Sequence, residues 1–458
     1  MGVTLERGMC LGKYFGTDGI RGVAGEKLTA AFALQVGQAA AAILKRETAR
    51  PCVIIGKDTR GSGDMLEAAV AAGLCAGGAD VKLLGVAPTP AVAYLTAAGG
   101  ADAGIMLTAS HNPAEDNGIK IFSSQGMKLP DNTEHAIEAL LDGSEPLPAE
   151  NRGGIGRVIH EGALVGRYID FIAGTAEGDL SGLKVAVDCA NGAAVRTARE
   201  LFAGLGADCG LYFCDPDGGN INAGCGSTCL EALSGRVRDG GYDCGVAFDG
   251  DADRCLVVDE QGQAVDGDKI MALCAVEAKR RGQLAQDTLV ATVMSNMGFH
   301  QFCRDNGIRV ETTAVGDRYV LERMLEKGYT LGGEQSGHII FRQYAASGDG
   351  QLTAVQFLSL VKRLGKPVSE LTAVFKNCPQ VLLGVTVDWL AKDAVVMHPA
   401  VMQAVKQAEE AFGTQGRVLV RASGTEPLVR VMTEGWDGEL VRRLANNLAA
   451  VVKTIAGG

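Results

Sequence analysis

The stretch that decides the fold reads CGVAFDGDADR and runs from Cys244 to Arg254. It opens with a short apolar run, typical of a buried strand, and a polar loop rich in aspartate follows directly. Two other stretches are built alike: the apolar run at 103–107 leads into TASHNP at 108–113, and the run at 329–332 leads into GEQSGH at 333–338. These matching stretches indicate an internal repeat.

Each of these runs is predicted to be the third strand of a unit in which short strands alternate with helical segments. First strands are predicted at 52–55, 184–187 and 288–293, and second strands at 81–84, 210–213 and 308–312. Short apolar strands between helices are typical of parallel sheets covered on both faces. Because open α/β sheets bind ligands beyond the carboxyl ends of their strands, we expect the three polar loops to meet at one cleft.

The chain after residue 370 breaks this pattern. Its predicted strands lie at 381–388 and 418–421 and its predicted helices at 399–412 and 438–454, which indicates a smaller α+β domain. The predicted fold class is therefore α/β: three similar domains with mixed or parallel sheets around a central cleft, and a smaller C-terminal α+β domain. The predicted domain boundaries are 1–158, 159–258, 259–370 and 371–458.

The composition is that of a folded chain with several domains. A length of 458 residues suits three or four domains, and 47% hydrophobic with 21% charged residues excludes wholesale disorder. Glycine supplies 63 residues, about twice its usual share. Such an excess without a collagen-like period predicts many tight loops, which is where functional sites concentrate.

Charge and cysteine usage narrow the class of protein. A net charge of -11 argues against a general binder of nucleic acid or of anionic membranes, although a local cationic pocket is compatible with it. The 13 cysteines are odd in number and include no C-x-x-C pair, so neither structural zinc nor a disulfide framework is expected. No apolar run is long enough for a membrane span and no signal-peptide pattern is present, so we expect a cytoplasmic protein with reduced thiols.

The polar loop at 249–254 carries carboxylates at alternate positions, on Asp249, Asp251 and Asp253. Carboxylate oxygens suit a divalent cation such as Mg²⁺, and carboxylates this close repel one another unless a cation lies between them. Three other interpretations stay open. An EF-hand would use Glu260 but needs glycine where the chain has Arg254; a phosphatase would use Asp249 as its nucleophile; and a solvated acidic turn would bind nothing.

The loop at 108–113 places the hydroxyl of Ser110 beside His111, with Lys120 further along the chain. Serine also caps turns, which is the purely structural interpretation. A Ser-His hydrolase is a further alternative, although the G-x-S-x-G motif of one large class is missing here. If the serine carried a phosphate, its oxygens could complete a metal site built by the three aspartates.

The loop RASGTEP at 421–427 has the composition of an anion cradle. Guanidinium, hydroxyl and backbone amide groups all donate hydrogen bonds to phosphate oxygens. The donors are Arg421, Ser423, Gly424, Thr425 and Arg430. Taken alone, this loop fits a structural turn equally well. A second glycine-spaced turn, GTDGIRG at 16–22, presents Arg21 and is weak evidence by itself.

Five loops together resemble the signature loops of the α-D-phosphohexomutases, in that family's order and over nearly the whole chain. They are FGTDGIRG at 15–22, TASHNP at 108–113, DGDADR at 249–254, GEQSGH at 333–338 and RASGTEP at 421–427. Gln335 and the sequence VGDRY at 315–319 are similar to the branch that acts on glucosamine phosphates, since the branches for mannose and glucose phosphates usually have Met and His there. Ala252 stands where many members have glycine, and we interpret it as a tolerated variant.

The resemblance implies a phosphoserine enzyme that interconverts glucosamine 6-phosphate and glucosamine 1-phosphate through a bisphosphorylated sugar. It is an intramolecular phosphotransferase that would feed UDP-N-acetylglucosamine and cell-wall precursors. The implied cofactors are one Mg²⁺ per chain and the phosphoserine. The resemblance assigns the phosphoserine to the first domain, the metal to the second, the sugar to the third and the non-reacting phosphate to the fourth.

Site residues are implied by the same resemblance. The implied catalytic residues are Ser110, Arg21, Lys120, Arg254 and His338, with Lys120 and His338 as acid/base candidates. The implied metal ligands are Ser110, Asp249, Asp251 and Asp253. The implied substrate-binding residues are Glu334, Ser336, Arg421, Ser423, Gly424, Thr425 and Arg430. His111 is expected to shape the serine loop.

Two alternative functions stay open, a sibling mutase for mannose or glucose phosphates and a Mg²⁺-dependent sugar-phosphate phosphatase. In each case the expected partner is a small sugar phosphate, with no nucleic acid and no membrane. The resemblance also leaves room for a homodimer.

Overall fold

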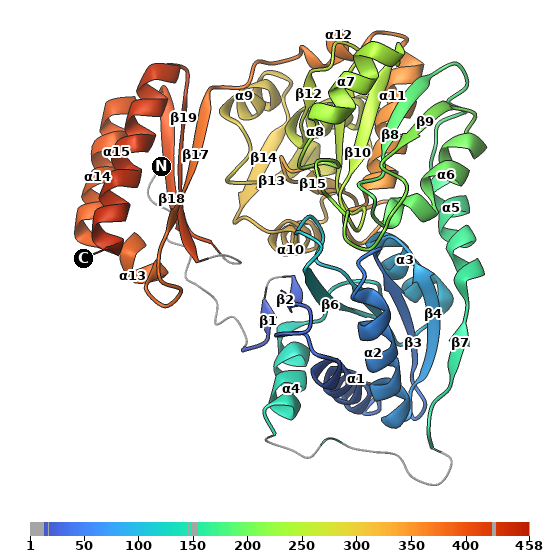
Figure 1. Cartoon of the computed structure of the whole chain (residues 1–458). Coiled ribbons are helices and arrows are strands. Elements are labelled where there is room, and N and C mark those ends of the chain that lie inside the picture. The colour runs from blue at the N-terminus through green and yellow to red at the C-terminus, as the bar shows by residue number, and fades with distance from the viewer. Residues whose placement is uncertain (1–12, 17, 144–146, 148–153, 424–426, 458) are drawn as a thin grey trace. The chain divides into compact units, whose positions relative to one another are not determined.

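The computed structural model describes residues 13–16, 18–143, 147, 154–423 and 427–457 (Figure 1). These residues form two compact units. The smaller unit combines Ser295–Asp305 with the described chain from Phe375 onward, and the larger unit holds the other described residues. None of the helices in the described ranges is long and apolar enough to cross a membrane.

The first sheet of the larger unit has seven strands. Their order is β1 (Phe15–Gly16), β2 (Gly19–Val23), β6 (Asp116–Ser123), β5 (Ala103–Leu107), β3 (Cys52–Lys57), β4 (Asp80–Val86) and β7 (Val158–His160). The strands β3, β4 and β5 are parallel, whereas β6 runs antiparallel to β5. The sheet is therefore mixed, and its serine loop lies between a parallel and an antiparallel strand.

Four helices accompany this sheet: α1 (Ala30–Leu44), α2 (Gly63–Ala76), α3 (Thr89–Gly99) and α4 (Asp131–Leu141). Thr29 starts α1, because its hydroxyl accepts a hydrogen bond from the free amide of Phe32. The helices α1 and α2 pack side by side (Figure 1). Gly73 allows this close approach, since a Cβ there would lie 2.1 Å from the carbonyl oxygen of Leu34.

The second and third sheets repeat the central strand order of the first. The second has β12 (Ala264–Val265), β11 (Cys255–Asp259), β10 (Cys244–Phe248), β8 (Lys184–Asp188) and β9 (Asp208–Tyr212). The third has β14 (Arg309–Thr313), β13 (Thr288–Thr292), β15 (Leu331–Gly333) and β16 (Ile339–Phe341). In each sheet the third predicted strand lies between the first strand and a later antiparallel strand. The predicted repeat is thus confirmed.

The rest of the larger unit connects these sheets. Its other helices are α5 (Val165–Ala173), α6 (Ala198–Gly204), α7 (Glu231–Gly240), α8 (Gly267–Arg280), α10 (Asp317–Lys327), α11 (Gly350–Leu364) and α12 (Val368–Thr372), with short 3-10 turns η1 (Gly162–Leu164), η2 (Ala193–Arg196) and η3 (Ala285–Asp287). Asp349 caps α11 by accepting from the amide of Leu352 and also accepts from the hydroxyl of Tyr168 on α5, at 2.9 Å in each case. The next residue, Gly350, donates its amide to the carbonyl of Ala252 at 3.0 Å. The start of α11 therefore supports the aspartate loop.

The smaller unit has a three-stranded antiparallel sheet, in the order β17 (Gln380–Thr386), β19 (Leu428–Gly435) and β18 (Gly416–Ala422). Its helices are α9 (Met297–Asp305), α13 (Lys392–Val396), α14 (Pro399–Phe412) and α15 (Gly438–Ala456). Apolar residues of β19 and α15, among them Val431 and Leu448, form its core. The predicted α+β character of the C-terminal part is confirmed.

Candidate active site

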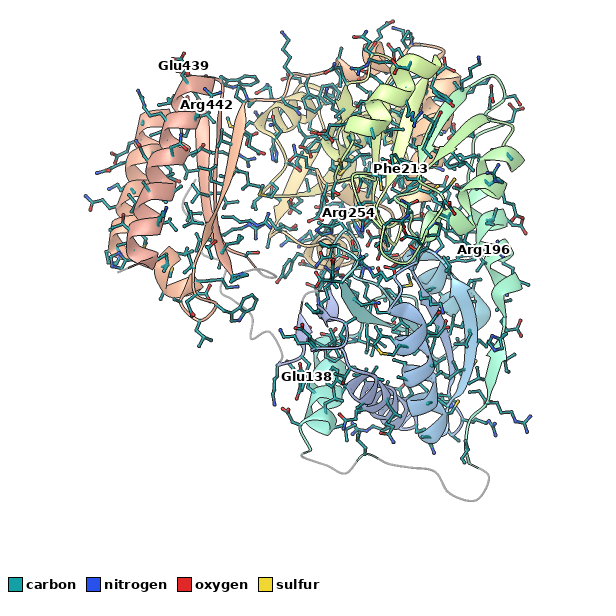
Figure 2. All side chains as sticks on the ribbon, in the orientation of Figure 1. Glu138, Arg196, Phe213, Arg254, Glu439 and Arg442 are labelled. Carbon is teal, nitrogen blue, oxygen red and sulfur yellow. The ribbon has the colours of Figure 1, made fainter. Side chains whose placement is uncertain are left out.

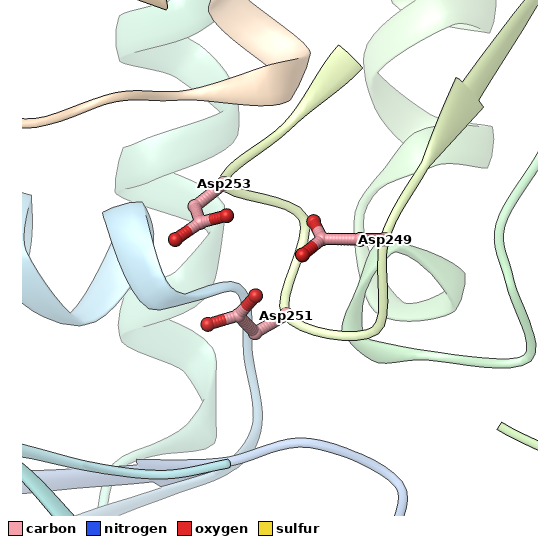
Figure 3. Close-up of side chains that lie close together, drawn as sticks. All are labelled: Asp249, Asp251 and Asp253. Atoms are coloured by element: carbon pink, nitrogen blue, oxygen red, sulfur yellow. The ribbon is translucent and has the colours of Figure 1, made fainter. Parts of the chain in front are cut away.

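Three carboxylates converge at the loop between β10 and β11. Asp249 directly follows β10, and Asp251 and Asp253 lie in the turn that returns the chain into β11. Figure 3 shows their side chains pointing into one shared space. One oxygen of each lies within 4.8 Å of the others, and the three residues are 0%, 0% and 7% exposed. The interpretation of this loop as a solvated acidic turn is therefore wrong.

The crowding of these carboxylates changes their pKa values. Burial, together with the charges of Asp253 and Asp251, raises the pKa of Asp249 well above its ordinary value. Burial acts in the same direction on Asp253, but the charges of Lys120 and His338 outweigh it, so the pKa of Asp253 is lowered. Holding several ionised carboxylates this close together costs free energy unless nearby cations neutralise their charge.

The aspartate triad fits a divalent cation because two of its buried carboxylate oxygens accept no hydrogen bond from the described residues. The Oδ1 atoms of Asp251 and Asp253 are buried and accept no hydrogen bond from the described part of the chain. Buried carboxylate oxygens that accept no hydrogen bond, in a triad this close together, suit a Mg²⁺ site. The loop is flanked by strands instead of helices, so the EF-hand interpretation is wrong.

The serine loop lies directly against the aspartate loop. Ser110 is 1% exposed, and its hydroxyl donates to Oδ2 of Asp249 at 2.6 Å. Its backbone has a φ of +53°, a left-handed conformation that is unusual for a residue with a side chain. Gly250 permits the close approach of the two loops, because a Cβ there would lie 2.5 Å from the carbonyl oxygen of Ser110. Two loops that lie far apart in the sequence thus meet at one hydroxyl.

His111 is adjacent to the serine but is a weak base here. Its Nδ1 lies 3.4 Å from the Ser110 hydroxyl oxygen. Burial, helped by the positive charges of Arg254 and Arg21, lowers the pKa of His111 to about 4. An imidazole of such low basicity takes a proton from a serine hydroxyl with difficulty, which weighs against the Ser-His hydrolase.

Lys120 lies between Asp18 and the aspartate triad and pairs with both. Its Nζ lies 2.8 Å from Oδ2 of Asp251 and 3.6 Å from both Asp18 and Asp253. Burial favours the neutral amine, but the three carboxylates outweigh it and raise the pKa of Lys120 above its ordinary value. Lys120 is therefore a buried ammonium that offsets the charge of the triad.

His338 brings the third loop to the same place. Its Nδ1 lies 3.6 Å from Oδ2 of Asp253, and its Nε2 lies 3.8 Å from Oδ2 of Asp317. Burial lowers the pKa of His338, but the surrounding carboxylates, led by Asp253, raise it to about 9. The imidazolium is therefore the favoured form at neutral pH in the arrangement described here. The three polar loops meet, as their position after equivalent strands predicts.

Two arginines complete the cationic part of the site. The Nε of Arg254 lies 4.0 Å from Asp249 and 3.9 Å from Asp253, and Figure 2 labels this side chain. Arg21 forms an ion pair with Asp18. The Nε atoms of both arginines are buried and donate to no acceptor within the described ranges. These donors are available for an anion.

The short hairpin of β1 and β2, which carries Asp18 and Arg21, contacts α4 through Glu138. One carboxylate oxygen of Glu138, labelled in Figure 2, accepts from the amides of Tyr14 and Phe15 at 2.6 and 2.8 Å. A carboxylate that accepts two backbone amides fixes the start of β1. The strand β2, which carries Arg21, pairs with β1 on one side and with β6 on the other.

Glu334 and Ser336, the predicted sugar-binding pair, lie together in the third loop. The amide of Gly316 donates to Oε1 of Glu334 at 3.1 Å, and the Ser336 hydroxyl lies 3.4 Å from Oε2. Gln335 points elsewhere and donates to Asp266 at 3.2 Å. One carboxylate and one hydroxyl from this loop are thus held close together.

Several charged or polar residues of the site were not predicted. They are Asp18, Thr89, Lys128 and Asp317. Lys128 pairs with Asp18 at 3.1 Å and with Asp317 at 2.8 Å, and the hydroxyl of Thr89 donates to Asp251 at 2.6 Å. Asp18 and Asp317 lie inside loops that the sequence singles out, whereas Lys128 and Thr89 carry no motif. Their roles depend on pairs distant in sequence.

The predicted phosphate-binding residues belong to the smaller unit. Arg421 on β18 stands directly opposite Arg430 on β19, so the two side chains share one face of the sheet. The Ser423 carbonyl accepts from Nζ of Lys392 at 2.6 Å, which anchors the start of the loop. Gly424 and Thr425 lie outside the described residues. The pairing places two positively charged residues on one face of this sheet, which is compatible with an anion site.

Family models match nearly the whole chain in a fixed order. The models describe the phosphoglucomutase/phosphomannomutase alpha/beta/alpha domain I at residues 12–147, domain II at 166–262, domain III at 266–378 and the C-terminal domain at 382–451. The chain belongs to the phosphoglucomutase/phosphomannomutase family. The resemblance seen in the five loops is therefore confirmed, and this phosphohexomutase is an enzyme of the isomerase class.

Two bacterial relatives of this phosphohexomutase are phosphoglucosamine mutases. The protein of Acetivibrio thermocellus is 50% identical over 449 residues, which make up 98% of this chain and 100% of the relative. The protein of Shouchella clausii is 51% identical over 449 residues, with the same coverage.

Solved structures show the same fold. A phosphoglucomutase/phosphomannomutase family protein from Burkholderia thailandensis has a TM-score of 0.80 and 25% identity, covering 97% of this chain and 98% of the other. The N-acetylphosphoglucosamine mutase of Aspergillus fumigatus, solved with GlcNAc-6P and magnesium, has a TM-score of 0.69 and 19% identity, covering 97% and 96%.

Proposed function

We propose that this phosphohexomutase interconverts glucosamine 6-phosphate and glucosamine 1-phosphate, and that it supplies UDP-N-acetylglucosamine and cell-wall precursor synthesis. The observation that carries the proposal is the identity of about 50% to phosphoglucosamine mutases along their full length. The meeting of Ser110 with the aspartate triad supports the same chemistry, because it places a hydroxyl nucleophile in a site built for charge neutralisation.

In the proposed cycle, Ser110 begins as a phosphoserine. The free O1 of glucosamine 6-phosphate attacks phosphorus, and the bond between phosphorus and the serine Oγ breaks. The O1 proton passes to a base, and the leaving Oγ takes up a proton from an acid. The products are glucosamine 1,6-bisphosphate and the serine hydroxyl. After the bisphosphate reorients in the site, the serine hydroxyl gives its proton to a base and Oγ attacks phosphorus on O6. The bond between phosphorus and O6 breaks, O6 takes up a proton from an acid, and glucosamine 1-phosphate leaves with the phosphoserine restored.

Each side chain in the larger unit receives a role from its position. Lys120, next to Asp251, and His338, next to Asp253, are the proposed acid/base residues that hold or release the proton. Arg21 and Arg254 are proposed to bind the transferring phosphoryl group through the donors that have no acceptor in the described chain. Glu334 and Ser336 are proposed to bind sugar hydroxyls, and the negative charge of Glu334 suits an ammonium group nearby.

The proposed cofactor is one Mg²⁺, with Asp249, Asp251, Asp253 and a phosphate oxygen on Ser110 as ligands. When bound, the ion supplies positive charge that stabilises the transferring phosphoryl group. The buried Oδ1 atoms of Asp251 and Asp253 are the observation that supports this ligand set.

Four further proposals rest on the sequence. The domain boundaries at 1–158, 159–258, 259–370 and 371–458, the cytoplasmic location and the homodimer stay predictions. We also propose that the partner of this chain is a small hexosamine phosphate. The N-acetylphosphoglucosamine mutase of Aspergillus fumigatus was solved with GlcNAc-6P, and an N-acetylglucosamine-phosphate mutase was solved in its substrate complex, which supports a small-molecule substrate.

A substrate panel tests the proposed function. We expect kcat/KM for glucosamine 6-phosphate to exceed that for glucose and mannose 6-phosphates by at least about tenfold, because a site acidic at Glu334 favours an amino sugar. Coupled assays of both isomers, with inorganic phosphate measured in parallel, separate the alternatives. A preference for a neutral hexose phosphate would indicate a sibling mutase, and release of inorganic phosphate without isomer would indicate a phosphatase.

Loss of Arg421 is expected to weaken both half-reactions. We propose that Arg421, with Ser423, Gly424, Thr425 and Arg430, holds the phosphate that is not reacting, on O6 in one half-reaction and on O1 in the other. Because remote binding energy is used to orient the substrate, Arg421→Ala should lower kcat as well as raise KM, with a cost of about 2–4 kcal/mol in kcat/KM.

The control for this variant is Arg442→Ala on α15, an exposed arginine labelled in Figure 2. It removes the same charge from the same unit, and its kinetics should match the wild type. Kinetics should be measured in both directions. A defect with the 6-phosphate and none with the 1-phosphate would show that the two half-reactions use separate phosphate sites.

A further inference from the structure

The loop that carries Ser110 has an exceptional set of backbone contacts. Arg60, in the segment after β3, is 3% exposed. Its Nε donates to the Asp58 carboxylate at 2.9 Å. Its two terminal nitrogens donate to three carbonyl oxygens of the serine loop, those of Ser110, Asn112 and Pro113, and to that of Asp116 at the start of β6. An arginine side chain has five N–H donors, so every donor of Arg60 is used, three of them on this loop and one on the strand that follows it.

A second side chain reaches the same carbonyls from another sheet. Asn222, in the segment between β9 and α7, donates through Nδ2 to the Ser110 carbonyl at 2.9 Å and to the Asn112 carbonyl at 3.1 Å. Arg60 donates to the same two oxygens at 3.0 and 2.8 Å. A carbonyl oxygen has two lone pairs. Both carbonyls are therefore saturated, each by one donor from the first sheet's segment and one from the second sheet's segment.

The inner side of the loop is fixed as well. The Thr108 hydroxyl donates to Asp58 at 2.7 Å and accepts from the amide of Ser110 at 2.9 Å. Asp58 thereby joins the Arg60 guanidinium to Thr108, the first residue of the serine loop. These contacts hold a left-handed serine, a conformation that a residue with a Cβ keeps only when its surroundings determine it.

We infer that Arg60 and Asn222 are positioning residues that set Ser110 against Asp249 for phosphoryl transfer. The inference rests on the proposed function for its kinetic consequence, but its structural content stands by itself. Neither residue is placed among the groups that touch substrate. They act through the backbone of the serine loop, and Asn222 makes the position of the nucleophile depend on the segment that also packs against Gly250.

The sharpest test is Asn222→Asp. Aspartate has the same shape and tolerates the left-handed φ of +59° at this position, but its carboxylate cannot donate to the two carbonyls. We expect kcat to fall about 10- to 100-fold, as for a misplaced reacting group, while KM stays within about threefold. Arg60→Lys, which keeps the charge and loses the fork, should change kcat in the same direction.

The matched control is Asn220→Asp. Asn220 lies in the same segment and donates to the Asp215 carbonyl at 3.0 Å instead of to the serine loop. Its kcat and its thermal unfolding temperature should match the wild type. A loss of activity in both variants to the same degree would assign the effect to the segment in general and would overturn the inference.

Hydrogen exchange separates this inference from the proposed function. Amides of the serine loop, including those of Ser110 and Asn112, donate inside the loop, and in Asn222→Asp they should exchange at least about tenfold faster than in wild type and in Asn220→Asp. Wild-type exchange in this loop, or a rise in KM alone, would overturn the inference. If the wild type lacked mutase activity, the proposed function would be overturned. Hydrogen exchange would then still decide whether Asn222 holds the serine loop in place.

Discussion

Ser110→Ala is expected to abolish mutase turnover, lowering kcat by at least about 10⁴-fold, because the variant has no oxygen to accept and return the phosphoryl group. The fold should survive. The side chain makes a 2.6 Å hydrogen bond to Asp249, and the backbone of the loop is held by Arg60 and Asn222 instead. Thermal unfolding should therefore stay within a few degrees of wild type.

Intact mass and peptide mapping provide the independent readout for this prediction. Wild-type enzyme in its active state should carry one added phosphoryl group on the peptide with Ser110, and the alanine variant should carry none. Ser123→Ala, at the end of β6 in the same sheet, is the matched control and should keep both the modification and the activity. Full activity in Ser110→Ala would rule out the phosphoserine mechanism.

Removal of divalent cations is the second large effect. Dialysis against EDTA should stop catalysis and added Mg²⁺ should restore it, because only side-chain cations such as Lys120 then offset the charge of the three buried carboxylates. Asp251→Asn should cost at least about 3 kcal/mol in kcat/KM, or about 10²-fold. Asp251 also accepts from Lys120 and Thr89, so the variant disturbs the charge balance of the site as well.

The metal prediction has a readout besides activity. Isothermal titration of Mg²⁺ into the dialysed protein should show a binding event that weakens at least about tenfold in Asp251→Asn. Asp239→Asn, an exposed carboxylate on α7, should bind Mg²⁺ as the wild type does. Near wild-type kcat in EDTA would contradict a metal-assisted transfer, whatever the titration shows.

The repeat could be predicted from the sequence because two of its third strands are wholly apolar. The runs at 103–107 and 244–248 coincide with β5 and β10 at both ends, since every residue in them is buried and a polar loop follows. The antiparallel strands β6, β11 and β16 were not predicted. Each begins soon after a polar loop, and its partner is chosen by sheet geometry instead of by its own pattern.

The site was predictable where chemistry is concentrated in one loop and not where it depends on pairing. Asp249, Asp251 and Asp253 stand out by their spacing alone. Lys128 does not, because its partners Asp18 and Asp317 lie more than a hundred residues away along the chain on either side. The role of Asn222 could not be predicted from the sequence for a further reason. Its acceptors are backbone carbonyls, which every residue has, so no side-chain pattern indicates them.

The repeated strand order has a consequence for how such a site can arise. A chain with a single repeat could bring three copies of its loop together only by self-association, and the copies would be identical. A nucleophile, an acidic triad and an imidazole facing one another require three different loops. When the repeats are joined in one polypeptide, each loop can change in sequence without altering the other two. Covalent fusion of the repeats therefore allows one gene to encode an asymmetric reaction centre.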